Sequence, residues 1–104
     1  MQDEDNSFFP EPVTLPIEDC LDLHTFAPRA IPDLLEEYLN QCHKAGLREV
    51  RIIHGKGIGA QRRQVHECLQ RNPLIERFYQ APAEAGGWGA TIAVLRAAGH
   101  EQAR

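Results

Sequence analysis

The sequence lacks long hydrophobic runs. A membrane-spanning helix needs about 18 consecutive apolar residues, and no such stretch occurs in the 104 residues. The segment from Met1 to Asn6 is acidic where a secretory signal would be basic, and no apolar run follows it. We therefore expect a cytoplasmic protein with no membrane contact.

Cysteine is scarce as well. The chain has three, Cys20, Cys42 and Cys68, and an odd number of widely spaced cysteines favours neither a disulfide framework nor a zinc knuckle. We interpret them as small, buried apolar residues. Hydrophobic residues make up 42% and charged residues 25%, which is ordinary for a globular protein. The length then suits a single domain with its own core.

Positive charge is absent from the N-terminal segment. Residues 1–19 hold six acidic residues, three prolines and no Lys or Arg, although the whole chain carries a net charge of only −4. The remainder is thus mildly basic, with eight basic and four acidic residues in positions 51–104. We predict a flexible N-terminal arm over 1–19, in which Phe8 and Phe9 are candidates for docking on a protein partner. The basic remainder permits contact with nucleic acid.

What remains is a clear alternation of strand and helix patterns. Apolar residues follow a helical stripe from Ile31 to Cys42, and Gly46 is a plausible stop. The patterns predict, in order, a strand at 20–24, a helix starting between Pro28 and Ile31, a strand at 49–54, a helix at 60–71, and strands at 74–80 and 90–95. We therefore predict a two-layer α/β sandwich over residues 20–96, with a frayed tail at 97–104.

Two histidines follow the first two predicted strands. His24 ends the first and His54 the second, and a single helical crossover makes those strands parallel. Both imidazoles are then expected to emerge at the carboxyl edge of the sheet, where ligands bind in open α/β folds. Asp22, on the same strand face as His24, is placed to orient an imidazole. Structural histidines and a zinc site are the alternatives, but these residues supply at most three metal ligands.

Glycines dominate the loop that follows His54. The run from His54 to Gly59 contains Gly55, Lys56 and Gly57 and leads into a helix that carries Arg62 and Arg63. Glycines let a backbone approach a ligand closely, and the N–H groups at a helix start can hold an anion. This combination favours a phosphodiester ligand. In the second glycine cluster, Trp88 can either stack on a base or cover the core.

Three segments resemble the motifs of the Smr (small MutS-related) domain family. Leu21–His24 is similar to its LDLH motif, His54–Gly57 with Gly59 and Arg62 to its HGxG motif, and Gly86–Thr91 to its C-terminal glycine motif. The resemblance implies a fold similar to the C-terminal domain of bacterial translation initiation factor three. It also implies nucleic-acid binding and endonuclease activity, with a family-level link to DNA repair. Thr25 and Gln61 depart from the family pattern, which puts the substrate in doubt more than the fold.

The resemblance assigns Asp22, His24 and His54 to catalysis. It assigns Gly55, Lys56, Gly57 and Arg62 to the substrate backbone, to which the loop chemistry adds Gly59, Arg63 and Trp88. On RNA, one histidine would take the 2′-hydroxyl proton and the other protonate the leaving oxygen. DNA would need an activated water, with Mg²⁺ or Mn²⁺. The alternative function is a nucleic-acid-binding module or adaptor without catalysis. The choice between DNA and RNA, and the oligomeric state, stay open.

Overall fold

The protein is described here by a computed structural model that covers residues 18–57 and 59–97. Most of the predicted N-terminal arm, including Phe8 and Phe9, and almost all of the predicted C-terminal tail lie outside these residues. Their proposed boundaries and the partner contact through Phe8 and Phe9 therefore stay predictions. Within the described part of the chain, no helix has the length and apolar character that crossing a membrane requires.

The described residues form the predicted succession of strands and helices. The elements are β1 (Cys20–Asp22), α2 (Ile31–Lys44), β2 (Glu49–Ile53), α3 (Ala60–Arg71), β3 (Ile75–Gln80) and β4 (Ala90–Leu95). A 3₁₀ turn over Pro28–Ala30 precedes α2, which confirms the predicted start of that helix. The predicted 81–89 loop contains two further 3₁₀ turns, Ala83–Ala85 and Gly87–Gly89.

The first strand is shorter than predicted. It ends at Asp22, although Leu23 still donates its N–H to the Ile53 carbonyl at 2.7 Å. The carboxylate of Asp22 accepts the backbone N–H of His24 at 3.0 Å, and Phe26 donates its N–H to the Leu23 carbonyl. Short aspartate side chains commonly bend the backbone in this way. The turn takes His24 off the strand.

The four strands form one sheet in the order β1-β2-β4-β3. β1 and β2 are parallel, as the helical crossover predicted. β4 lies between β2 and β3 and is antiparallel to both. Every residue of β4 is buried, as suits the largely apolar sequence of this strand. The central strand of the sheet is thus the last one in the sequence.

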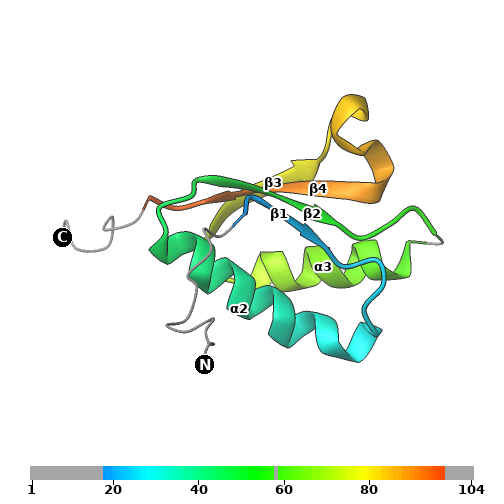
Figure 1. The fold of residues 1–104 in the computed structure, drawn as a ribbon, viewed down its shortest axis with the longest axis horizontal. Coiled ribbons are helices and arrows are strands. Elements are labelled where there is room, and N and C mark those ends of the chain that lie inside the picture. The colour runs from blue at the N-terminus through cyan, green and yellow to red at the C-terminus, as the bar shows by residue number, and fades with distance from the viewer. Residues whose placement is uncertain (1–17, 58, 98–104) are drawn as a thin grey trace, which may run out of the picture.

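Both helices cover the same face of the sheet, which gives the two-layer sandwich that the sequence predicts (Figure 1). The hydrophobic core lies between the layers and is made of Leu23, Ile31, Leu35, Tyr38, Leu39, Cys42, Val50, Ile52, Val65, Leu69, Ile75, Ala93 and Leu95. Burying a side chain of this size stabilises the fold by about 1.5–3 kcal/mol. The three cysteines are free thiols; Cys42 is buried, whereas Cys20 and Cys68 are half-buried.

Three connections meet at one end of the molecule. The end of β1, the loop from β2 to α3 and the 3₁₀ turns before β4 all lie on the right in Figure 1. The first two meet because β1 and β2 run parallel. The third joins them because β4 begins opposite the end of β2, where Ala90 pairs with Ile53. This end of the sheet carries the predicted functional residues.

Candidate active site

Asp22 and His24 form an exposed pair at this end. The Nδ1 atom of His24 lies 2.5 Å from Oδ1 of Asp22, and the two side chains are 55% and 50% exposed. The hydrogen bond from the His24 ring, followed by the one from its backbone N–H, lowers the pKa of Asp22. A carboxylate accepts hydrogen bonds, so Nδ1 of His24 carries the hydrogen. The other ring nitrogen, Nε2, is left to accept a proton.

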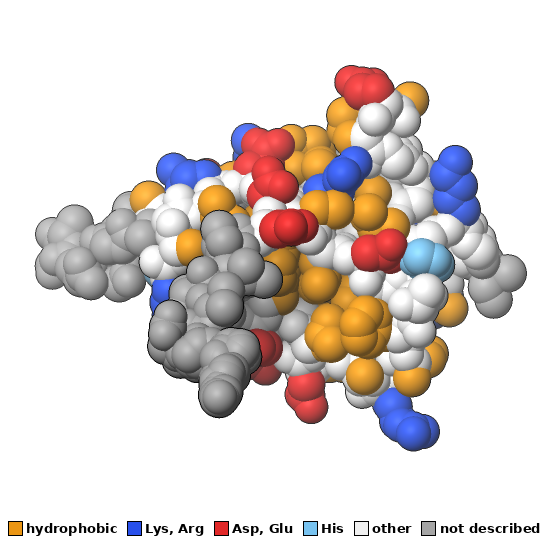
Figure 2. Space-filling model, in the orientation of Figure 1, with side chains coloured by type: hydrophobic (Ala, Val, Ile, Leu, Met, Phe, Trp, Pro, Cys, Tyr) orange, Lys and Arg blue, Asp and Glu red, His pale blue; other side chains and the backbone are white. Residues whose placement is uncertain are grey.

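The surface shows the same arrangement. In Figure 2 a histidine side chain lies at the right-hand end of the molecule with an acidic side chain against it. A basic side chain stands above them on the same end. An exposed histidine held by a carboxylate is the arrangement that general acid-base catalysis uses.

His54, in contrast, does not emerge from the sheet edge as expected. The residue is only 2% exposed. Its Nε2 atom lies 2.9 Å from the Thr91 hydroxyl and its Nδ1 atom 3.2 Å from the Gly55 carbonyl oxygen. Side chains alternate along a strand, so His54 continues the inward-facing set of Val50 and Ile52. Burial lowers its pKa, and the positive charge of Arg62 adds to that effect.

The glycine loop packs directly against His24. A Cβ atom added to Gly55 would lie 3.4 Å from the His24 Cβ, and Gly55 has a φ of +91°. Gly59, at the start of α3, has a φ of +94°, whereas Gly57 is exposed and Ile58 lies outside the described residues. A hollow of about 190 Å³ opens beside the loop, lined by His54, Gly55, Gly57, Gly59, Ala60, Gln61 and Arg62.

The second glycine cluster holds this loop in place. The Gly89 carbonyl accepts the N–H groups of both His54 and Gly55, each at 3.0 Å. The side chain of Lys56 lies over Gly89, where an added Cβ would come within 2.9 Å of the Lys56 Cγ. The two glycine segments that the sequence separates by about thirty residues are therefore one structural unit.

Arg62 and Trp88 form a stacked pair beside the loop. The Arg62 guanidinium carbon lies 4.1 Å from the centroid of the Trp88 ring, and Trp88 is 44% exposed. The ring also lies 3.8 Å from the position of a Cβ on Gly59. Trp88 thus borders the loop and does not cover the core. Arg63 is exposed, and no contact joins its side chain to the loop among the described residues.

Thr91 and His66 were not assigned to the site from the sequence. Thr91 is fully buried in β4, and its hydroxyl lies 2.7 Å from Nε2 of His66 on α3. The rings of His54 and His66 meet edge to face, with their centroids 6.0 Å apart. Gln61, a departure from the family pattern, donates to the Phe26 carbonyl at 3.3 Å and so joins α3 to the turn after β1.

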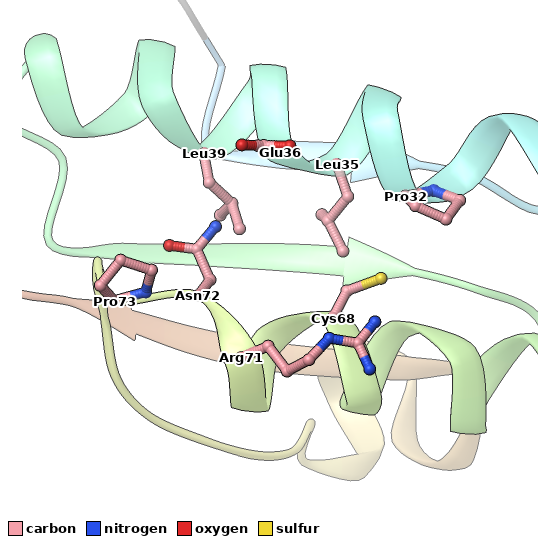
Figure 3. Close-up of a pocket in the computed structure, with 8 residues that line it drawn as sticks. All are labelled: Pro32, Leu35, Glu36, Leu39, Cys68, Arg71, Asn72 and Pro73. Atoms are coloured by element: carbon pink, nitrogen blue, oxygen red, sulfur yellow. The ribbon is translucent and has the colours of Figure 1, made fainter.

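No metal centre is evident in the part of the chain that the structure describes. Within residues 18–57 and 59–97, no three His, Cys, Asp or Glu side chains gather as metal ligands would. His54 is buried, whereas Asp22 and His24 are exposed. A further hollow of about 210 Å³ lies between α2 and α3, lined in part by Leu35, Cys68 and Arg71 (Figure 3). It contains none of the predicted site residues.

The fold and the site together define a class: a small two-layer α/β sandwich with an Asp–His pair and a glycine-rich, basic loop at one sheet edge. The family model for the Smr domain matches residues 21–96. The chain belongs to the Smr domain family. This agrees with the resemblance carried by the three sequence motifs.

Similar proteins support this assignment. The chain is 41% identical over 80 residues to Endonuclease MutS2 of Halothermothrix orenii, covering 77% of this chain but 10% of that protein. It is 39% identical over 62 residues to Endonuclease MutS2 of Thermus thermophilus, covering 60% of this chain and 8% of that one. The chain therefore spans about a tenth of the length of these relatives.

Two crystal structures share the fold. The Smr domain of Thermus thermophilus MutS2 superposes with a TM-score of 0.72 at 33% identity, covering 76% of this chain and 99% of that one. YdaL, a stand-alone small MutS-related protein from Escherichia coli, superposes with a TM-score of 0.73 at 28% identity, covering 78% of this chain and 66% of that one. Both match the four-stranded, two-helix architecture described above.

Proposed function

We propose that this domain is an endonuclease that binds nucleic acid along the edge formed by the glycine loop and cuts a phosphodiester bond with His24. The observation that carries the proposal is the exposed Asp22–His24 pair, packed directly against Gly55 at the mouth of that loop. The relatives named Endonuclease MutS2 support it. The domain accounts for about a tenth of their length, so the activity is proposed for this part on its own geometry.

In this mechanism Asp22 holds His24 so that Nε2 faces the substrate. Nε2 takes a proton from the attacking oxygen, which is the 2′-hydroxyl of RNA or a water molecule on DNA. The attacking oxygen then bonds to phosphorus, the bond to the leaving oxygen breaks, and the leaving oxygen takes a proton from water. Proton transfer is assigned to His24 alone because His54 is buried with both ring nitrogens occupied.

Positive charge and an aromatic ring supply the binding surface in this proposal. Lys56 is exposed above the loop, and the helix start of α3 adds N–H groups that can hold a phosphate. The Arg62–Trp88 stack lies next to them. The exposed part of Trp88 can stack on an unpaired base while Arg62 and Arg63 face the backbone.

A cleavage assay tests the proposal. Wild type, His24→Ala and His43→Ala would be compared on end-labelled single- and double-stranded RNA and DNA, first in EDTA and then with Mg²⁺ or Mn²⁺. His43 lies on α2, away from the site, and serves as the control. Loss of a general base typically costs about 10²- to 10⁴-fold in rate. Cleavage by His24→Ala at the wild-type rate would contradict the proposed role of His24.

A binding module without catalysis is the second candidate. It is favoured by the burial of His54, which leaves one exposed imidazole where the acid-base scheme on RNA expected two. Such a domain would bind RNA or DNA with an affinity that falls steeply with salt but would show no turnover in the assay above. Turnover that disappears in His24→Ala would exclude this candidate.

A further inference from the structure

A chain of hydrogen bonds runs through the protein beneath the glycine loop. It links His66 on α3, Thr91 on β4 and His54 at the end of β2, with spacings of 2.7 Å and 2.9 Å at the Thr91 hydroxyl. His54 continues it to the Gly55 carbonyl. Thr91 is fully buried and His54 nearly so. The mechanism proposed above uses none of these side chains for proton transfer.

The direction of each hydrogen bond follows from the chemistry of the partners. A carbonyl oxygen only accepts, so Nδ1 of His54 must carry the hydrogen that faces Gly55. A neutral imidazole has one N–H, so Nε2 of His54 accepts and the Thr91 hydroxyl donates to it. That hydroxyl has a single hydrogen, and its oxygen is left to accept from Nε2 of His66.

The surroundings of the two rings favour their neutral forms. Burial lowers the pKa of both His54 and His66. Arg62 on α3 adds positive charge next to both rings, and the Phe78 ring of β3 packs 5.0 Å from the His66 ring. Within the described residues the structure places no carboxylate against either imidazole. A neutral histidine can hold only one tautomer in a given hydrogen-bond pattern.

We propose that His66 and Thr91 are positioning residues for the glycine loop. They hold His54 as its Nδ1–H tautomer, and this tautomer holds the Gly55 carbonyl and the left-handed backbone of Gly55 against His24. The chain of contacts thereby runs from α3 through β4 and the end of β2 to the exposed Asp22–His24 pair. The tautomer assignment stands on the hydrogen bonds alone, while its effect on cleavage rests on the proposed function.

The tautomers are measured directly by long-range ¹H–¹⁵N correlation spectra of the uniformly ¹⁵N-labelled wild-type chain, with the two rings assigned from His54→Gln and His66→Gln. We expect the Nδ1–H pattern for His54 and the Nε2–H pattern for His66. The Nε2–H pattern at His54 would overturn the proposal. This measurement does not depend on cleavage activity. If a glutamine variant does not fold, the two rings can be assigned by through-bond correlation in the wild type instead.

Two variants of Thr91 test the positioning role. Thr91→Val keeps the shape and removes the hydroxyl, whereas Thr91→Ser keeps the hydroxyl. We expect Thr91→Val to lose the single His54 tautomer and to shift the Gly55 amide resonance, and Thr91→Ser to retain both. An unchanged tautomer and Gly55 resonance in Thr91→Val would overturn the proposal even if the variant lost stability.

Cleavage provides the functional arm. Misplacing a site by about 1 Å costs roughly 100-fold in rate, so we expect a loss of that order in kcat for Thr91→Val, with rescue by Thr91→Ser. A wild-type kcat in a folded Thr91→Val would overturn the link to cleavage. If the wild type itself does not cut, the proposed function fails, and the spectra still decide the tautomer.

Discussion

Acidification from about pH 7.5 to about pH 5 should destabilise this domain through His54 and His66. Both have a pKa lowered by burial, so between that lowered value and the ordinary 6.5 the unfolded chain binds protons that the folded one does not. Stability then rises with pH across this window. The contribution of the two histidines to stability is complete above their pKa in the unfolded chain. It is lost progressively as the pH falls toward their lowered pKa in the folded protein.

The magnitude of this pH effect follows from the number of histidines whose pKa is lowered in the folded protein. Each group protonated only in the unfolded chain contributes at most about 1.4 kcal/mol per pH unit. The two histidines together therefore give a ceiling of about 2.7 kcal/mol per pH unit inside the window. A domain of this size has a total stability of about 5–15 kcal/mol, so the effect is a large fraction of the whole.

Urea unfolding followed by far-UV circular dichroism at a series of pH values measures the slope. His66→Gln removes one of the two titrating rings and should lower the slope by about half. Asp22→Asn is the control: the pKa of Asp22 is lowered from 3.8, so its own contribution is lost only at still lower pH. A wild-type free energy of unfolding that stays constant, or increases, as the pH is lowered from about 7.5 to about 5 would refute the reasoning.

Three further predictions concern the surface of the site. Lys56→Ala should weaken binding to all nucleic-acid sequences alike and reduce the slope of log affinity against log salt by about 0.7–0.9, measured by fluorescence anisotropy; an unchanged slope would remove Lys56 from the phosphate contacts. Trp88→Leu should weaken single-stranded binding by about 1–3 kcal/mol and leave duplex binding less affected, and equal losses on both would argue against base stacking. Gly55→Ala and Gly46→Ala each place a side chain at positive φ (+91° and +85°), at a cost of about 1–2 kcal/mol in unfolding free energy; only Gly55→Ala, which meets His24, should also slow cleavage.

Local patterns were sufficient to predict the elements and the general fold. The stripe from Ile31 to Cys42 identified α2, because helical periodicity is a property of neighbouring residues. The crossover between 20–24 and 49–54 predicted the parallel pair. The insertion of β4 between β2 and β3 was not predicted, since the pairing of distant antiparallel strands leaves no mark on the pattern of any one of them.

In the candidate site, too, contacts between residues close in the sequence were predictable and contacts between distant residues were not. Asp22 and His24 were predicted together because they lie two residues apart at a strand end, and they do meet. The burial of His54 could have been inferred, since strand alternation places it with Val50 and Ile52. The contacts of Thr91 with His66 could not, because they join residues 25 positions apart on different elements. Nothing in the local spacing of either residue points to the other.

The shared Gly89 carbonyl has a consequence for how the chain can vary in length. A surface connection between strands usually tolerates inserted or deleted residues. Here the segment from Ala81 to Gly89 ends in the Gly89 carbonyl, which accepts the N–H groups of His54 and Gly55. The side chain of Lys56 also packs against Gly89, where there is no room for a Cβ atom. Adding or removing a residue just before β4 would displace that acceptor. A change of length in this segment should therefore destabilise the protein more than the same change in an ordinary surface connection.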